Sequence, residues 1–353
     1  MAVKSSREIA SAVKKLAIVI LNFNTKELLK ECVESIFPTS DFRLPTSDIA
    51  VEIIVVDNSS TDGSVQYVNQ LMRYGLPARN RCAQSLAGGR VTDKEKKNAQ
   101  LATRDRITVK LIANKENLGF AAGNNVGIKE AIKNGADYVM ILNSDTFVKD
   151  RFWKPMIKVL ESDEKIGVVG PKIYFAPGFE FHKNRYKKSE LGKVIWSVGG
   201  LMDWKNIYGS NRGVDKVDRG QYDQVKEVDN VSGCCLLARA EIWEKAKFFN
   251  EQYFMYYEDA DFCEKIKSLR YKICYVPDSE VWHKNAGSSK VGGSLQDYFI
   301  IRNRFLFGFR WASLRTKIAL FRESLKLLFS GREWQKQGVK DFYFRKFGVG
   351  NWK

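Results

Sequence analysis

Three carboxylates stand close together in the second half of the sequence. Glu258, Asp259 and Asp261 directly follow an aromatic run at 254–257. A carboxylate held beside a hydroxyl group can remove its proton and act as a general base. Acidic residues also favour the first turn of a helix, so helix capping remains the simpler interpretation. Three carboxylates behind an aromatic run are more than capping requires, so a general base is the second interpretation of this cluster.

Asp145 is a candidate ligand for a divalent cation. It ends the sequence Asn143-Ser144-Asp145, which follows a hydrophobic run, so its carboxylate is expected at the edge of a sheet. Hard cations take oxygen ligands and few protein groups, with diphosphate oxygens completing the set. A turn that caps a helix is the alternative at this position. His283, beside Trp282, is one of two histidines, and a surface or packing role is its simplest interpretation.

Polar clusters end other hydrophobic runs. They are Asn22-Phe23-Asn24, the stretch 57–62 and the stretch 117–125. The second is also compatible with a plain turn rich in Asp, Asn and Ser. The third contains glycine but lacks the Gly-Lys-Ser/Thr of a Walker loop, and no Gly-x-Gly-x-x-Gly follows the first hydrophobic run. A dinucleotide-binding protein is therefore disfavoured.

Strands alternating with helices must position these clusters. Four hydrophobic, β-branched runs predict strands, at 16–21, 51–56, 107–113 and 138–142. Apolar residues at helical spacing predict helices between them, at 25–37, 65–72 and 121–134. Such alternation predicts a parallel sheet, because each crossover needs a helix. Ligands of these sheets bind beyond the carboxyl ends of the strands, where the polar clusters converge.

The rest of the chain is less regular. Strands are expected at 168–175, 231–237 and 271–276, and a helix at 241–246. Two segments rich in glycine and charge, 73–106 and 176–226, are expected to form an inserted loop and a loop with a hairpin, respectively.

The composition is typical of a folded protein. Of 353 residues, 44% are hydrophobic and 12% aromatic, which is enough to offset the entropy cost of ordering. The six cysteines show neither a zinc spacing nor a disulfide framework, so we expect reduced thiols and a cytoplasmic protein. We expect neither a signal peptide nor a transmembrane segment, because three arginines interrupt the longest apolar stretch, 299–314.

The positive charge is concentrated near the end of the sequence. The formal net charge is +17, and residues 298–353 contain 13 Lys/Arg against 3 Asp/Glu. A basic, aromatic tail can face nucleic acid or an anionic membrane surface. We disfavour nucleic acid, because no recognised binding motif is present and carboxylates crowd the predicted site.

Taken together and in order, these clusters resemble the family 2 glycosyltransferases of the GT-A fold, particularly the rhamnosyltransferase-like branch. The matching segments are 17–24, 54–63, 117–120 with 124–127, 142–145, 257–261 and 282–283. The resemblance covers about residues 15–305. It implies an α/β GT-A fold with a mostly parallel central sheet flanked by helices. The expected parts are an N-terminal tail (1–14), a nucleotide-sugar half (about 15–150), an acceptor half (about 151–295) and a basic, aromatic helical region (296–353).

The resemblance also implies roles for single residues. Asp259 matches the family's general base, with Glu258 and Asp261 as supporting acids. Asp145 matches the second carboxylate of an Asp-x-Asp motif and would bind Mn²⁺ or Mg²⁺ with the donor diphosphate, while His283 would complete the metal shell. The residues expected to bind the nucleotide sugar are Asn22, Asn24, Asp57, Asn58, Asn117, Gly119, Phe120, Asn125, Asn143 and Ser144. Asn143 departs from the pattern, since many members have Asp there, and Asn at this position favours a dTDP-sugar.

The function implied is that of an inverting, metal-dependent hexosyltransferase in cell-surface polysaccharide synthesis. It would move a sugar, with rhamnose favoured, from a dTDP- or UDP-sugar to a glycan or polyprenyl-linked acceptor. We expect it in the cytoplasm or peripherally on the inner face of the cell membrane. A sugar-nucleotide nucleotidyltransferase would share the sheet and the metal but would carry a glycine-rich, basic loop where this chain has residues 22–25. The sequence Arg302-Asn303-Arg304 also matches the family, although a core helix whose arginines reach solvent is the alternative.

Overall fold

The computed structural model describes residues 13–37, 49–75, 107–285 and 293–352. Most of the predicted tail (1–14) and inserted loop (73–106) therefore lies outside the described residues, although Arg73 and Tyr74 end a helix. The first half contains, in chain order, β1 (Lys14–Asn22), α1 (Lys26–Ile36), β2 (Ile49–Asp57), α2 (Ser64–Tyr74), β3 (Ile107–Ala113), α4 (Gly119–Lys133) and β4 (Tyr138–Asn143). Every strand and helix predicted in this half is present.

The second half adds further strands and helices to the same sheet. They are β5 (Thr146–Val148), α5 (Trp153–Ser162), β6 (Ile166–Phe175), β7 (Ile195–Ser197), β10 (Lys226–Glu227), β11 (Cys235–Arg239), α6 (Ala240–Lys245), α7 (Glu258–Ser268) and β12 (Lys272–His283). A separate hairpin joins β8 (Gly200–Asp203) and β9 (Tyr208–Asn211). The sequence analysis did not predict β5 or α5.

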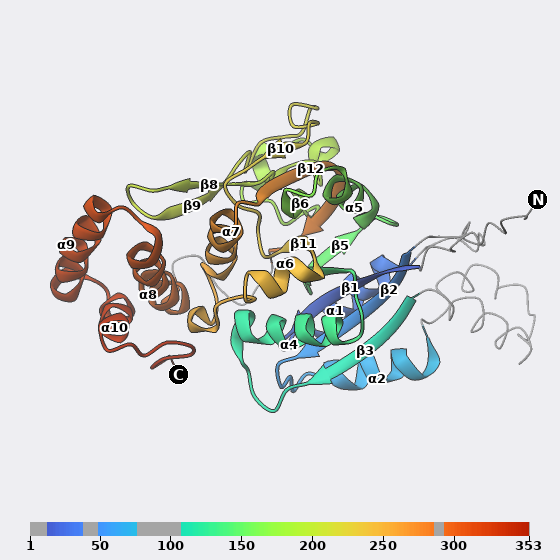
Figure 1. The fold of residues 1–353 in the computed structure, drawn as a ribbon, viewed down its shortest axis with the longest axis horizontal. Helices are drawn as coiled ribbons and strands as arrows, with labels where there is room; N and C mark the ends of the chain where they lie inside the picture. Colours follow the sequence, from blue (N-terminus) through green and yellow to red (C-terminus); the bar gives the residue numbers. More distant parts are fainter. Residues whose placement is uncertain (1–12, 38–48, 76–106, 286–292, 353) are drawn as a thin grey trace, which may run out of the picture.

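The main sheet has the order β10-β12-β6-β11-β4-β1-β2-β3. Strands β3, β2, β1 and β4 are parallel, as predicted. Beyond them β11 runs antiparallel to both β4 and β6, while β12 pairs in parallel with β6, so this part of the sheet is mixed. All four parallel strands of the first half bring their carboxyl ends to one edge (Figure 1).

Strand β1 shows how the sequence builds layers on both sides of the sheet. Leu16, Ile18 and Ile20 belong to one apolar core with α1, α2 and α5. Ala17 and Val19 belong to another core with α4, α6 and α7. Successive strand residues face opposite sides, so a strand that is apolar throughout requires helices on both faces. The result is a three-layer arrangement that holds the strand ends in place.

Two predicted strands differ from those observed. The strand expected at 231–237 begins at Cys235, because residues before it form a turn in which Cys235 N–H donates to Ser232 O at 3.3 Å. The run at 271–276 continues through an irregularity after Val276 to His283, making one long strand, β12.

The basic C-terminal region forms three helices. They are α8 (Ser294–Trp311), α9 (Leu314–Ser330) and α10 (Glu333–Tyr343). Figure 1 shows them grouped at one end of the molecule, beside α7 and the β8–β9 hairpin. An apolar core there includes Ile207, Tyr253, Phe305 and Leu320, and it joins the three helices to the β8–β9 hairpin and to the segment before α7. None of the described helices is long and apolar enough to cross a membrane.

Candidate functional site

Asp145 and His283 lie side by side at the edge of the sheet. Strand β5 pairs antiparallel with β12, and Thr146 stands opposite His283 in this register. His283 Nε2 is 3.1 Å from Asp145 Oδ1. Lys284 N–H donates to Asp145 O at 2.9 Å and so continues the pairing. The two predicted metal ligands, far apart in the sequence, are therefore brought together by strands, with both side chains buried.

One ring nitrogen of His283, the buried Nδ1, has no hydrogen-bond partner within the described residues. The Trp196 ring packs edge-on against the imidazole at 4.8 Å. Burial lowers the pKa of His283, whereas Cys234 and Asp145 raise it by more. Burial raises the pKa of the Cys234 thiol, which is therefore neutral near pH 7.

A carboxylate and an imidazole together are a partial ligand set for Mn²⁺ or Mg²⁺. In the described part of the chain, no three or more His, Cys, Asp or Glu residues gather into a group that could hold a metal ion. Such cations are commonly held by one or two protein carboxylates and completed by substrate phosphates. Asp145 and His283 therefore fit a cation that arrives with a diphosphate.

Asn22 and Asp57 end neighbouring parallel strands and stand opposite each other in register. Asn22 Nδ2 donates to Asp57 Oδ1 at 2.9 Å and to Ser60 Oγ at 3.0 Å. Ser60 N–H donates to Asp57 Oδ2 at 2.8 Å. Both side chains are buried, so the carboxylate is fixed at the sheet edge. Its oxygens retain lone pairs for a further N–H donor, such as that of a nucleotide base.

Hydrogen bonds connect this pair with the end of β4. Thr25 Oγ1 donates to Asn22 Oδ1 at 2.8 Å and shares a hydrogen bond of 3.1 Å with Ser144 Oγ. Ser144 directly precedes Asp145, so the predicted nucleotide-binding carboxylate and the predicted metal ligand belong to one connected group. Asn24 closes the turn beside them, with φ 53° and its Oδ1 accepting from Thr61 N–H at 2.8 Å.

Asn58 and Asn117 form the other wall of this edge. Asn58 Nδ2 donates to Asn117 Oδ1 and to Gly119 O, both at 3.1 Å. Gly119 has φ 79°, and a Cβ atom there would lie 2.4 Å from the Phe254 ring. Glycine is required at this position by both its backbone conformation and the close approach. The same contact brings the nucleotide-sugar half against the segment that precedes Glu258.

Asp259 and Glu258 begin α7 and are held differently from each other. Asp259 accepts hydrogen bonds from Gly233 N–H at 2.9 Å and from Ala260 N–H at 2.8 Å. Burial raises the pKa of Asp259, although these hydrogen bonds oppose the rise. Glu258 Oε2 is buried with no hydrogen-bond partner among the described residues. Burial, followed by the charge of Asp259, raises the pKa of Glu258 well above its usual value.

The third acidic residue has a different position. Asp261 is fully buried, and its Oδ1 accepts from Trp311 Nε1 at 2.8 Å and lies 3.2 Å from Arg310. Lys265, one turn along α7, is 3.4 Å from Asp261 Oδ2. Asp261 therefore joins α7 to α8, a contact that accounts for its burial without a chemical role.

Short segments connect Asp259 to the metal ligands. Gly233, which donates to Asp259, precedes Cys234, and Asn143 N–H donates to Cys234 O at 2.9 Å. Phe120 also approaches this turn, since a Cβ atom on Gly233 would lie 3.2 Å from its ring. The predicted base and Asn143 are therefore both hydrogen-bonded to the turn at 232–234, and Cys234 of the same turn raises the pKa of His283.

Asn125 lies apart from this group. Its Nδ2 donates to Phe249 O, and its Oδ1 accepts from Phe249 N–H, both at 3.0 Å. It lines a cavity of about 590 Å³ together with Lys129, Lys265 and Arg310. Asp145, Asp259 and His283 do not line that cavity. The structure therefore does not bring Asn125 together with the other predicted donor-binding residues.

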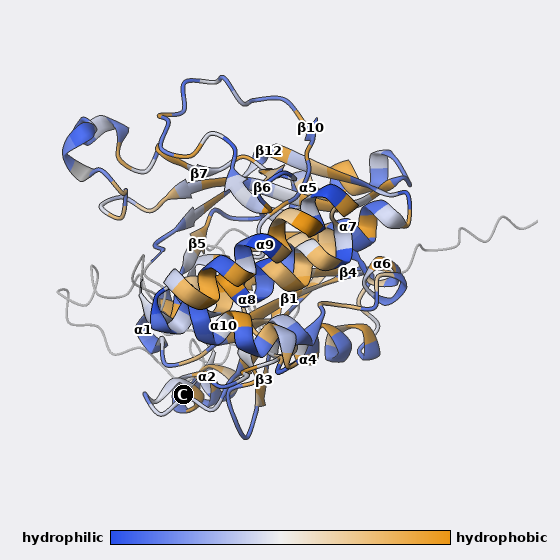
Figure 2. Ribbon diagram, turned by 90° about the vertical axis from the view of Figure 1, so that its left-hand side faces the viewer, coloured by the Kyte–Doolittle hydropathy of each residue, from blue (hydrophilic) through white to orange (hydrophobic). Residues whose placement is uncertain are grey.

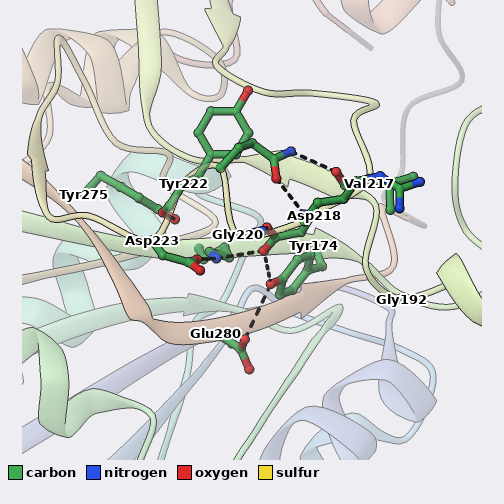
Figure 3. A network of polar contacts seen from close by, with 12 residues as sticks. Tyr174, Gly192, Val217, Asp218, Gly220, Tyr222, Asp223, Tyr275 and Glu280 are labelled. Atoms are coloured by element: carbon green, nitrogen blue, oxygen red, sulfur yellow. Dashed lines mark hydrogen bonds and ion pairs between the residues drawn. The ribbon is translucent and has the colours of Figure 1, made fainter.

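A buried polar network supports the strand that carries His283 (Figure 3). Tyr174 donates to Asp218 at 2.6 Å, and Lys172 is 2.7 Å from the same carboxylate. Trp282 stacks on Tyr174 with ring centroids 5.6 Å apart. These contacts fasten the segment around Asp218, which was expected to form a loop, onto β6 and β12. Sequence reasoning missed this network, because its members lie in separate segments without a shared motif.

Arg302 and Asn303 hold the segment before α7, which we call the acid loop (252–257). Asn303 Nδ2 donates to the carbonyl oxygens of Tyr253, Met255 and Tyr256 at 2.7–3.0 Å. Arg302 donates to the carbonyls of Gln252 at 3.3 Å and Tyr253 at 3.0 Å. Both side chains are fully buried, so the alternative in which the arginines reach solvent is wrong for Arg302.

Arg304 is also buried but points elsewhere. It forms a two-pronged ion pair with Glu323 of α9 at 2.7 and 2.8 Å. It donates to Asn206 O at 2.7 Å. Arg304 therefore fastens α9 and the β8–β9 hairpin to α8, and the arginine alternative is wrong at this position too.

Comparison with curated proteins finds distant relatives. The chain is 24% identical over 193 residues to a low-salt glycan biosynthesis hexosyltransferase of Haloferax volcanii, covering 54% of this chain and 57% of the relative. It is also 24% identical over 198 residues to an N-acetylglucosaminyl-diphospho-decaprenol L-rhamnosyltransferase of Mycobacterium tuberculosis, covering 54% of this chain and 63% of the relative. These matches thus span about three fifths of the relatives' own length.

The fold and the family are established by two further comparisons. A crystal structure of GalNAc-T7 with UDP, GalNAc and Mn²⁺ superposes on 95% of this chain and 57% of its own, with a TM-score of 0.50 and 14% identity. At that identity the likeness shows the fold, which is the GT-A fold. The sequence model described as glycosyltransferase like family 2 matches residues 14–305. The chain therefore belongs to glycosyltransferase-like family 2.

Proposed function

We propose that this chain is an inverting glycosyltransferase that moves a sugar from a nucleotide diphosphate sugar to a hydroxyl group of a glycan or lipid-linked glycan. The observation that carries the proposal is the 3.1 Å approach of Asp145 to His283 at the carboxyl edge of the sheet. Asp57 ends a parallel strand at the same edge. Asp259 is attached to the adjoining turn through Gly233.

In this proposal each part of the site has one task. Asp57 accepts a hydrogen bond from the nucleotide base, and Asp145 and His283 hold Mn²⁺ or Mg²⁺. A bound cation supplies charge neutralisation for the leaving diphosphate. Asp259 removes the proton from the acceptor hydroxyl as that oxygen attacks the anomeric carbon. A single base and a direct displacement invert the configuration at that carbon.

The proposed donor rests on Asn143, and the proposed acceptor rests on a relative of this chain. Asn143, in place of the Asp of many members, favours a dTDP-sugar, with rhamnose first and UDP-sugars next. The name of the mycobacterial relative describes a diphospho-decaprenol acceptor and a rhamnosyl donor group. We extend both to this chain as a polyprenyl-linked acceptor in cell-surface polysaccharide synthesis, used by a peripheral protein on the inner face of the cell membrane.

Product analysis tests the proposal. The full chain is incubated with Mn²⁺, a polyprenyl-diphosphate-linked sugar and each of several dTDP-, UDP- and GDP-sugars. We expect release of a nucleoside diphosphate and a glycosylated lipid whose new anomeric centre, read by NMR, is inverted. Release of pyrophosphate from a nucleoside triphosphate and a sugar phosphate would instead identify a nucleotidyltransferase. A retained configuration would rule out direct displacement by the acceptor oxygen and, with it, the role of Asp259 as the single base.

A further inference from the structure

Helix α9 presents a row of large apolar side chains to solvent. These side chains are 41–83% exposed and belong to Leu314, Ile318, Phe321, Leu325 and Phe329. At 100° per residue they fall within about 80° of the helix circumference. Single exposed apolar residues are common on soluble proteins, but a continuous row marks an interaction surface. We call these five residues the α9 stripe.

The other side of α9 is attached to the protein. Thr316, Leu320 and Ser324 are buried, and Leu320 belongs to the apolar core shared with α8. The ion pair between Arg304 and Glu323 fixes the helix further. The α9 stripe is therefore turned outward by a helix that is already packed. Figure 2 views the molecule from this side and shows hydrophobic and hydrophilic residues on the outer face of α9.

Basic side chains border the α9 stripe. Arg315, Arg322 and Lys326 are exposed and lie along one flank, and Lys317 lies on the other. None of these four forms an ion pair with another described residue. Glu323 is the single acidic residue of α9, and Arg304 already binds it. The border of the stripe is thus uniformly cationic, with no internal carboxylate to neutralise it.

We propose that α9 docks on an anionic lipid surface, lying in the plane of the headgroups with the α9 stripe inserted and its basic flanks on the phosphates. An apolar face with basic borders is the pattern of helices that bind the membrane interface. A second copy of the chain is a poorer occupant, because two cationic borders would repel each other. This proposal identifies the surface that would bring the proposed enzyme to a lipid-linked acceptor, yet it does not require the transfer reaction.

Vesicle binding tests the docking surface without turnover. The full chain is sedimented with vesicles of phosphatidylcholine alone or containing phosphatidylglycerol, at low and high salt. We expect binding to the anionic vesicles, lost at high salt. Replacing both Phe321→Gln and Phe329→Gln should weaken binding at least about tenfold, since two aromatic rings no longer leave water. Replacing Arg315→Gln, Arg322→Gln and Lys326→Gln should weaken it about 100-fold, at about fivefold for each lost cation.

Matched variants on α2 provide the control. Met72 and Tyr74 are 46% and 62% exposed on a helix remote in sequence from α9, so Met72→Gln with Tyr74→Gln removes comparable apolar surface. This variant should bind anionic vesicles as tightly as the unchanged protein does. All variants should have the same melting temperature as the unchanged protein. Equal binding by the Phe321/Phe329 variant, or no vesicle binding by the unchanged chain, would overturn the proposal. A loss of self-association in sedimentation velocity, with vesicle binding unchanged, would assign the α9 stripe to a second copy.

Discussion

We call the sheet edge that carries Asn22, Asp57 and Asp145 the donor edge. The donor edge and the acid loop are held in place in different ways. At the donor edge, Asn22 and Asp57 end adjacent strands and bond each other, so the sheet itself sets their positions. Non-glycine residues with positive φ, a conformation that costs energy, occur at Phe254, Tyr256 and Tyr257 in the acid loop and at Asn24 and Ser59 beside the donor edge, so the difference lies in what holds each region. The carbonyl groups of the acid loop are bound mainly by a helix about 50 residues further along the chain.

Backbone strain in the acid loop lowers the stability of the fold, and contacts from α8 compensate for part of it. A residue held in a sparsely populated backbone conformation costs about 1–3 kcal/mol. The two N–H donors of the Asn303 amide, shared among three carbonyl oxygens, contribute about 1 kcal/mol each and so offset part of that cost. We infer that the donor edge forms with the sheet, whereas the position of Asp259 depends on the docking of α8.

The largest loss of activity is expected from a change of the proposed base, Asp259. Asp259→Asn should fold normally and lower kcat by about 10²–10⁴-fold, because general base catalysis contributes that range. Affinity for the nucleotide sugar should change little. Steady-state kinetics and calorimetric donor binding measure the two quantities. Asp261→Asn is the control, since it alters the neighbouring carboxylate that joins α7 to α8 and should mainly lower the melting temperature.

The pH profile sharpens the same assignment. Asp259 must be ionised to accept a proton, and burial raises its pKa. The rate should therefore fall on the acid side at a pH above the usual value for aspartate, about 3.9. A near-normal kcat for Asp259→Asn would remove the residue from catalysis.

The next largest expected change is a loss of donor binding, and it tests the donor edge alone. Asp145→Ala should weaken Mn²⁺-dependent donor binding at least about 100-fold, because loss of even an outer contact of a metal site costs 10–100-fold. Addition of a chelator should produce the same loss in the unchanged protein. Asp62→Ala is the control, since Asp62 lies at the same edge but accepts from the N–H groups of Lys26 and Ser64. Donor affinity that is insensitive to chelation would contradict the metal assignment.

The contrast also explains what the sequence could predict. Strands β1, β2, β3 and β4 were predicted because β-branched runs separated by helical spacing report buried parallel strands directly. The polar residues after each run then had to meet at one edge. The approach of Asp145 to His283 needed the family resemblance, since β5, which makes the pairing, is three residues long and carries no pattern of its own.

Other features had no local signal. Asn125 shares α4 with Gly123 and Gly127, which pack against β1 and β2, yet its own amide binds Phe249. The spacing of residues along α4 does not reveal which side chains face the predicted site and which face Phe249. The buried hydrogen bonds of Asn303 depend on contacts across about 50 residues. Arg302 and Arg304 look like surface residues in the sequence, because burial of arginine is rare unless its donors are paired.

A smaller loss is expected when the acid loop is released from α8. Asn303→Ala removes the amide that donates to three carbonyl oxygens of the acid loop and should lower kcat about tenfold while leaving donor affinity unchanged. Arg304→Lys is the matched control, because Arg304 binds Asn206 and Glu323 but no carbonyl of the acid loop. Both variants should lose about 1–3 kcal/mol of stability. A parallel fall in kcat for the two variants would make Asn303 a stability residue rather than a positioning residue.

The smallest effect concerns the unpartnered carboxyl of Glu258. Its pKa is raised in the folded protein by burial and by Asp259, whereas about 4.3 is usual in an unfolded chain. Its favourable contribution to folding is therefore complete below about pH 4 and is lost as the pH rises through the folded value. Glu258→Gln removes this dependence, so the difference in melting temperature between variant and unchanged protein should become more positive by about 2 °C or more from pH 5 to pH 9.

The change of this melting-temperature difference with pH is informative, because any effect of Glu258→Gln that is the same at every pH does not alter it. A buried amide without a partner lowers stability at every pH, so it shifts the difference without changing its slope. Glu333→Gln, at the exposed start of α10, makes the same chemical change on the surface and is the control for the substitution itself. A flat difference for Glu258→Gln would mean that this carboxyl is solvated or paired in solution.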